Sequence, residues 1–101
     1  MAVAFIQEFA VEGDHTTTGY DAVAEALNLS GAPDGLIAHT AGFDGDVFRI
    51  FDVWETREQG DQFMNEQLNP IIERFMANPP SDDFRPPTRE SWYDLHDSMA
   101  G

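Results

Sequence analysis

The sequence predicts an α+β fold, a ferredoxin-like βαββαβ domain built on a four-stranded antiparallel sheet. Apolar runs typical of strands alternate with amphipathic helical stretches in the order strand, helix, strand, strand, helix, strand. An Asp-Gly pair between the second and third strands is a strong signal for a hairpin. The length of 101 residues suits one domain covering 1–101.

The first half of the chain predicts one strand and one helix. Residues 3–10 (VAFIQEFA) are rich in strand formers and fit a strand that is buried on both faces. Residues 17–28 predict a helix, to which the preceding threonines offer N-cap oxygens. Its apolar side chains recur at i, i+3, i+4 and i+7 and are expected to face the core: Tyr20, Val23, Ala24 and Leu27.

Residues 36–42 and 47–55 predict the two strands of the hairpin. With Asp44-Gly45 as the turn, His39 pairs with Ile50 and lies diagonal to Asp52, at roughly 7–8 Å. One face of the hairpin then carries these side chains: Ile37, His39, Ala41, Phe48, Ile50, Asp52 and Trp54.

The second half predicts a helix, a long loop and a last strand. Thr56 and Gln59 have the spacing of a capping box at the start of the helix, and Asn69-Pro70 predicts a kink or a restart. Residues 77–89 form a proline-rich loop. Residues 90–98 predict the last strand, with a short helix as the alternative.

Two helices can cover only one face of such a sheet. Both faces of the third strand are nevertheless apolar. The second face therefore needs a cover, and the same face of another subunit would supply it. The sequence thus predicts a symmetric homodimer.

The amino-acid composition excludes several classes of binding partner. The chain has 19 acidic residues against five arginines and no lysine, a formal net charge of −14. Such a surface repels phosphate groups, so nucleic acid and anionic membranes are not expected as partners. There is no cysteine, which removes disulfides and thiolate chemistry. Neither a basic leader nor an apolar run long enough to span a membrane occurs, so we expect a cytoplasmic protein.

His39 and Asp52 are the candidate catalytic residues. A carboxylate near an imidazole raises the pKa of the histidine and fixes its tautomer, which makes His39 a candidate general base. The alternative is that the two side chains only satisfy each other in a buried sheet. A metal is not expected, although two histidines and an aspartate on neighbouring strands could hold one. The candidate ligand-binding residues are Trp54, Ile50, Phe48, His96 and Gln7.

Three segments resemble a known superfamily. GLIAHTAG, VFRIFDVWET and FMNEQLNPIIERF together resemble the dimeric α/β-barrel proteins of the antibiotic biosynthesis monooxygenase type, in a branch with no assigned reaction. The resemblance covers nearly the whole chain. Its most specific part is Trp54-Glu55-Thr56, where the third strand leads into the second helix.

The resemblance implies a homodimer with facing sheets and a pocket between each sheet and its helices or tail. Characterised members include cofactor-free monooxygenases of phenolic polyketides and haem-degrading enzymes, and Trp54 matches the pocket tryptophan of both. Ile50 stands where the polyketide oxygenases carry asparagine, and Gln7 is the counterpart of a first-strand asparagine in the haem-degrading members. Phe63 lies where those members carry their iron-binding histidine, so neither haem nor another cofactor is expected.

We therefore expect a protein that binds a small hydrophobic or aromatic ligand and acts as a cofactor-independent monooxygenase on a phenolic, enolic or polyketide-like substrate. His39, assisted by Asp52, would deprotonate a substrate that stacks near Trp54. Two alternatives stay open. One is a non-catalytic homodimeric structural or ligand-binding module. The other is an isomerase or cyclase that uses the same base without oxygen.

Overall fold

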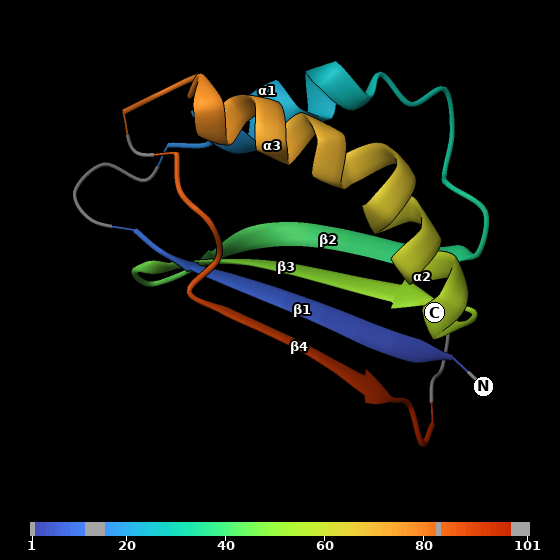
Figure 1. The fold of residues 1–101 in the computed structure, drawn as a ribbon. Coiled ribbons are helices and arrows are strands. Elements are labelled where there is room, and N and C mark those ends of the chain that lie inside the picture. Colours follow the sequence, from blue (N-terminus) through green and yellow to red (C-terminus); the bar gives the residue numbers. More distant parts are fainter. Residues whose placement is uncertain (1, 12–15, 83, 98–101) are drawn as a thin grey trace.

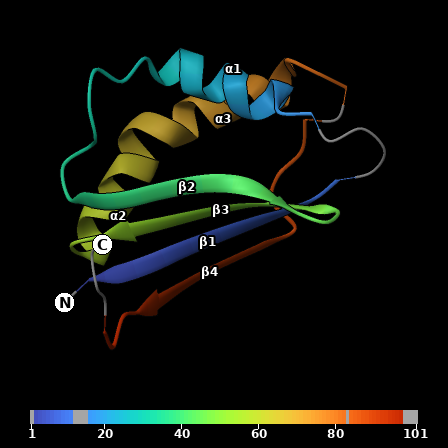
Figure 2. The ribbon, with the colours of Figure 1, turned by 180° about the vertical axis from the view of Figure 1, so that it is seen from behind.

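The computed structural model describes residues 2–11, 16–82 and 84–97. Four strands form one antiparallel sheet in the order β2-β3-β1-β4, and the helices lie together over one of its faces (Figures 1 and 2). The predicted βαββαβ arrangement is confirmed. Along the chain the elements are β1 (Val3–Ala10), α1 (Thr18–Leu27), β2 (Leu36–Asp44), β3 (Val47–Trp54), α2 (Arg57–Phe63), the π-helical turn η1 (Met64–Leu68), α3 (Asn69–Ala77) and β4 (Arg89–Asp94).

The best-packed part of the molecule lies beneath α2, where β1 begins and β3 ends. Val3 pairs with Trp54, and both are buried. Phe5 is also buried, and its ring stacks on Trp92 of β4 with the ring centroids 4.3 Å apart. Helix α2 approaches these aromatic side chains closely because it presents Gly60 to them.

Replacing Gly60 with alanine is expected to lower the free energy of unfolding by about 1–3 kcal/mol, the usual cost of overpacking. A Cβ at this position would lie 2.6 Å from Cη2 of Trp92 and 3.3 Å from Cδ1 of Trp54. Urea denaturation measures the change. Gly31→Ala is the matched control, because no atom lies within 4 Å of its added Cβ. Equal stability of the two variants would contradict this packing.

Helices α1 and α3 contain no fully buried residue. The apolar stripe of α1 was expected to pack in the core, but it faces a cavity that is described below. The helix has the predicted limits, since Thr17 and Asn28 flank it and Asn28 adopts the left-handed conformation at the C-cap. Thr17 does not cap the backbone with its side chain. Its hydroxyl instead donates a hydrogen bond to Asp21 at 2.8 Å.

The second helical region starts and restarts where the sequence predicts. The Thr56 hydroxyl accepts a hydrogen bond from the backbone N–H of Gln59 at 3.1 Å, which is one half of a capping box. Pro70 then lies in the first turn of α3. A proline there has no N–H to donate and would crowd the carbonyl four residues earlier. The wider turn of η1, in which the Asn69 N–H bonds to the Met64 carbonyl, accommodates it.

The last strand is shorter than predicted. It covers Arg89–Asp94 rather than residues 90–98, and the short helix offered as the alternative does not form over that range. The strand pairs with β1, whose first residue, Val3, lies opposite Asp94, so the ladder ends there. His96 follows in a bend and is exposed, while residue 98 lies outside the described ranges.

Among the described residues, no helix covers the sheet face on the far side from α1, α2 and α3, and several apolar side chains lie on that face. Strand alternation places Ile6, Phe51 and Val53 on it. Tyr93, on the same face, is 45% exposed. Arg49 also lies on this face, where it pairs with Glu8 at 2.9 Å.

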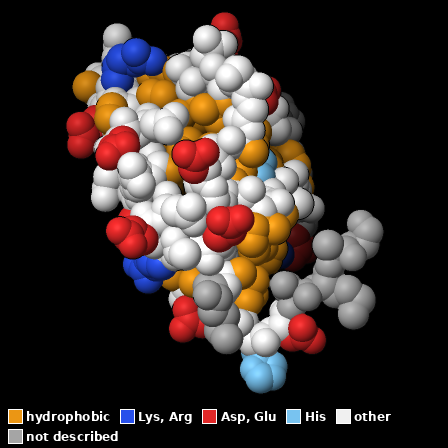
Figure 3. All heavy atoms as spheres, turned by 90° about the vertical axis from the view of Figure 1, so that its right-hand side faces the viewer, with side chains coloured by type: hydrophobic (Ala, Val, Ile, Leu, Met, Phe, Trp, Pro, Cys, Tyr) orange, Lys and Arg blue, Asp and Glu red, His pale blue; other side chains and the backbone are white. Residues whose placement is uncertain are grey.

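Acidic side chains are scattered over the surface shown in Figure 3, and apolar side chains gather along one side of that view. Within the ranges that the structure describes, no helix is long and apolar enough to cross a membrane.

Candidate functional site

The hairpin brings His39 and Asp52 directly opposite each other. The closing pair is Asp44 with Val47, so the two-residue turn is Gly45-Asp46 rather than Asp44-Gly45. Gly45 takes φ +58° in the first loop position, where glycine is favoured in a type II′ turn. The predicted pairing of His39 with Ile50 is therefore wrong by two residues. Because a shift of two preserves the side-chain alternation, His39 and Asp52 still share a face.

A β-bulge changes the face of one predicted residue. The register shifts between Leu36 and Ala38, so Ile37 is the extra residue in β2. Ile37 is 56% exposed, whereas Leu36 lines the cavity beside Trp54. The expectation that Ile37 shares the face of His39 is corrected accordingly.

Three side chains form a continuous hydrogen-bonded chain. His39 Nδ1 lies 2.5 Å from Asp52 Oδ1, and His39 Nε2 lies 2.6 Å from the Tyr20 hydroxyl. A carboxylate only accepts, so Nδ1 carries a hydrogen. In the neutral ring, Nε2 then accepts a hydrogen bond from the tyrosine hydroxyl. The edge strand β2, the inner strand β3 and helix α1 each contribute one member.

Tyr20 is the residue that the sequence analysis missed, since it was expected in the core. Its ring lies nearly parallel to that of His39, with an interplanar angle of 7°, and meets Phe48 edge-on. The sequence signal for Tyr20 was its hydroxyl group. The hydroxyl of a buried tyrosine usually has a hydrogen-bond partner, so a tyrosine on an apolar helical stripe indicates a polar group nearby.

The hydrogen bonds and burial of this three-residue network change the pKa values of His39 and Tyr20. The hydrogen bond from Asp52 raises the pKa of His39 above its usual value, against a smaller opposing effect of burial. Burial raises the pKa of the Tyr20 hydroxyl, and the negative charges of Asp52 and Asp21 raise it further. At neutral pH Tyr20 is therefore a protonated phenol, and His39 accepts a proton more readily than an isolated imidazole.

This pairing predicts a pH-dependent difference in stability between the wild type and Asp52→Asn. A histidine whose pKa is raised in the folded state stabilises the protein below its unfolded pKa of about 6.5. That contribution disappears as the pH rises through the folded pKa. Urea denaturation at a series of pH values should therefore give the larger difference below about pH 6.5 and a smaller one at alkaline pH. A difference that grows with pH would contradict the pairing.

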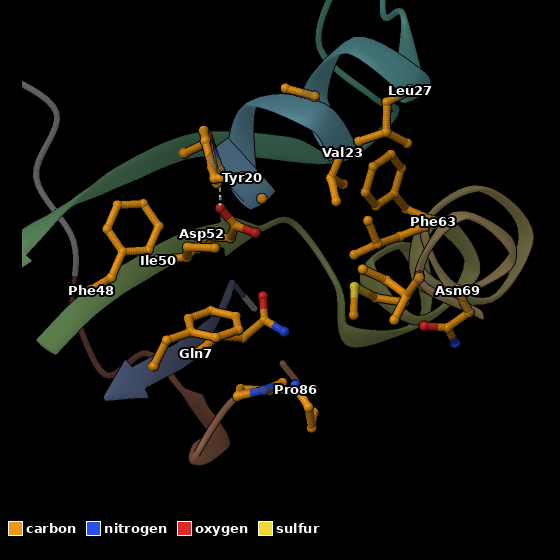
Figure 4. Close-up of a pocket in the computed structure, with 18 of the residues that line it drawn as sticks. Gln7, Tyr20, Val23, Leu27, Phe48, Ile50, Asp52, Phe63, Asn69 and Pro86 are labelled. Atoms are coloured by element: carbon orange, nitrogen blue, oxygen red, sulfur yellow. Dashed lines mark hydrogen bonds and ion pairs between the residues drawn. The ribbon is translucent and has the colours of Figure 1, made fainter. Parts of the chain in front are cut away.

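The hydrogen-bonded chain opens on a large cavity of about 520 Å³ between the sheet and the helices (Figure 4). The three members line it together with four of the predicted ligand-binding residues, Gln7, Phe48, Ile50 and Trp54. His96 does not line it, because β4 ends before that residue. The structure thus brings six of the seven predicted site residues to one cavity.

The walls of the cavity are mostly apolar. Figure 4 shows Val23 and Leu27 of α1 on one side and Phe63 of α2 beside them. The segment between α3 and β4 contributes Phe84 and Pro86. Phe84 is held by edge-to-face packing on Phe75, with the centroids 5.8 Å apart. The space therefore suits a ligand with a large apolar body and a few polar groups.

Two further polar groups of the cavity, the Gln7 amide and the Trp54 indole, come from β1 and β3. The Gln7 side chain donates to Glu90 at 3.1 Å, which orients its amide. Trp54 is 2% exposed, and no hydrogen-bond acceptor for its Nε1 lies among the described residues. Trp54 thus acts mainly as an apolar wall.

Known proteins resemble this chain in fold rather than in sequence. No family model matches the sequence, and no curated protein matches it significantly. The NE2512 protein of unknown function from Nitrosomonas europaea superposes with a TM-score of 0.70 at 21% identity, covering 99% of this chain and 94% of that one.

Two further solved structures carry assigned or provisional activities. SnoaB, a cofactor-independent oxygenase from Streptomyces nogalater, matches with a TM-score of 0.64 at 15% identity, covering 99% of this chain and 98% of that one. A provisionally assigned antibiotic biosynthesis monooxygenase from Deinococcus radiodurans matches with a TM-score of 0.65 at 10% identity, covering 99% and 97%. The chain therefore has the ferredoxin-like fold of the proteins of the antibiotic biosynthesis monooxygenase type.

Proposed function

We propose that this protein is a cofactor-independent monooxygenase that binds a phenolic or enolic, polyketide-like substrate. One observation carries the proposal: a histidine that is hydrogen-bonded to Asp52 lines a cavity of about 520 Å³ with mostly apolar walls. A core histidine that only satisfied its neighbours would not need such a space beside it. The cavity leaves room for a substrate to bind beside the base.

The chemistry needs only a base and oxygen. Transfer of the substrate's acidic proton to His39 gives an electron-rich phenolate or enolate, which reacts with O2 at a carbon that bears hydrogen to give a peroxide anion. The His39 imidazolium returns its proton and gives the hydroperoxide. Loss of water, which takes the hydrogen from the same carbon, leaves a new carbonyl group. One oxygen atom stays in the product and the other leaves as water, so no external reductant is required. The protein supplies the proton acceptor, His39, and an apolar space around the anion.

The fold is consistent with this proposal. SnoaB, which has the same architecture, is a cofactor-independent oxygenase. Ile50 in this chain is apolar, so the cavity floor holds the substrate by contact rather than through a hydrogen bond at that position. Orientation of the substrate would then depend on the polar side chains around His39, which are Asp52 and Tyr20.

We also propose that the chain forms a homodimer through the outer face of its sheet. Ile6, Phe51 and Val53 lie on that face, and Tyr93 leaves nearly half of its surface exposed there. Partly exposed apolar side chains gathered on one face of a sheet commonly mark an interface. Sedimentation equilibrium should give twice the 11.3 kDa mass of the chain, and a monomer at micromolar concentration would contradict the dimer.

Oxygen consumption tests the proposed reaction. Phenols, naphthols and anthrones are incubated with the protein in an oxygen-electrode cell, and products formed under ¹⁸O2 are analysed by mass spectrometry. The proposal expects oxygen uptake equal to turnover, with one ¹⁸O atom in each product. Equal turnover without oxygen would indicate an isomerase or cyclase. Failure of every compound to bind would leave a structural module.

A further inference from the structure

We propose that Tyr20, rather than His39 itself, contacts the ionising hydroxyl of the substrate and relays its proton to His39. This inference rests on the proposed function, because it assigns a role within the same site. It makes Tyr20 a further catalytic residue, and His39 the acceptor that acts through it. None of the motifs in the sequence points to this residue.

The geometry around His39 favours a relay through Tyr20. His39 has two ring nitrogens, and both already have partners: Nδ1 faces Asp52 at 2.5 Å and Nε2 faces the Tyr20 hydroxyl at 2.6 Å. A substrate hydroxyl could reach Nε2 only by displacing the tyrosine. The Tyr20 oxygen, in contrast, uses its hydrogen toward His39 and keeps its lone pairs for another donor.

The location of the Tyr20 hydroxyl favours the same role. Tyr20 lines the cavity and reaches it from α1, on the helix side, while His39 and Asp52 lie on the sheet. Figure 4 shows Tyr20 and Asp52 close together, with Val23 and Leu27 farther along α1. A substrate whose apolar body lies along α1 would therefore bring its hydroxyl to Tyr20.

The proton balance is simple. The substrate O–H bond breaks, and its proton passes to the Tyr20 oxygen. The original Tyr20 O–H bond breaks at the same time, and that proton passes to His39 Nε2. The products are a substrate anion, an intact Tyr20 that now donates to that anion, and an imidazolium that faces the Asp52 carboxylate. Tyr20 carries one proton before and after the transfer.

The surrounding charges support a relay rather than a resident tyrosinate. Burial and the nearby carboxylates of Asp52 and Asp21 raise the pKa of Tyr20, so it does not give up its proton without receiving another. The hydrogen bond that Asp52 accepts from His39 raises the pKa of His39, which favours formation of the imidazolium.

Tyr20→Phe separates this role from a packing role. The variant keeps the ring that lies parallel to His39 and meets Phe48 edge-on at 5.5 Å, and it removes only the hydroxyl. Tyr93→Phe is the matched control, because Tyr93 is the other tyrosine of the chain and lies on the outer face of the sheet. Circular dichroism establishes that both variants are folded.

The experiment uses para-nitrophenol as the probe, since its ionised form has its own absorption band. Absorbance gives the fraction of bound probe that is phenolate, and ¹⁵N NMR of His39 reports imidazolium formation on binding. In the wild type and in Tyr93→Phe, the apparent pKa of the bound probe should fall by about one unit and His39 should gain a proton. In Tyr20→Phe the probe should still bind, without the shift and without protonation of His39.

Three other outcomes would overturn the proposal, and they are distinguishable. If Tyr20→Phe ionises the probe as the wild type does, His39 acts directly and the relay is wrong, while the proposed function stands. If the wild type binds the probe without ionising it, the site contains no effective base and both proposals fail. If the wild type does not bind the probe, the cavity is not a phenol site, and the relay fails with it.

Discussion

His39→Gln should lower kcat by a factor of about 10²–10⁴ on any substrate that the oxygen screen identifies, the usual contribution of a general base. Glutamine keeps a polar side chain of similar reach but cannot accept a proton at neutral pH. KM should change much less, because the apolar walls that hold the body of the substrate remain. Steady-state oxygen uptake measures both constants.

The matched control for this variant is His96→Gln. His96 is exposed in the bend after β4 and does not line the cavity. Its replacement should leave kcat and KM unchanged. Equal losses in the two variants would mean that the effect is not local to the cavity, and an unchanged kcat in His39→Gln would remove His39 from the reaction.

Trp54→Ala should lower the free energy of unfolding by about 3–5 kcal/mol, in the range for a large aromatic side chain removed from a core. Trp54 is 2% exposed, pairs with Val3 across the sheet and packs against Phe63 with the ring centroids 5.6 Å apart. Its removal would join the space left behind to the existing cavity, so little collapse can compensate. Urea denaturation followed by circular dichroism measures the loss.

Trp54→Phe provides the comparison. No acceptor among the described residues pairs with the indole Nε1, so this variant loses ring volume without losing a hydrogen bond. It should cost clearly less than the alanine variant. A loss below about 1 kcal/mol for Trp54→Ala would contradict the packing of α2 on this end of the sheet.

The order of the elements was predictable because each carries a local signal of its own. The apolar stripe of α1, the threonine before α2 and Pro70 in the first turn of α3 all act within a few residues of the chain. The shared face of His39 and Asp52 was predictable for a related reason. Alternation along a strand has a period of two, and moving the turn by one residue shifts the pairing by two.

The rest of the site depends on contacts between distant segments. The hydrogen bond from Tyr20 to His39 joins residues 19 positions apart, and no periodicity encodes which helical residue will lie over which strand residue. His96 was predicted to lie on the last strand and to line the cavity. That strand ends at Asp94, because Asp94 pairs with Val3, the first residue of β1. The bulge at Ile37 likewise appears only once β2 is paired with β3.

The pKa of His39 decides whether Asp52 makes His39 a proton acceptor at the cavity. NMR titration of the imidazole in the wild type and in Asp52→Asn gives the two values. We expect a wild-type pKa above the usual value of about 6.5 and a clear fall in the variant, since the hydrogen bond that Asp52 accepts from His39 is the main cause of the rise. Identical titration of His39 in the two proteins would contradict this role of Asp52.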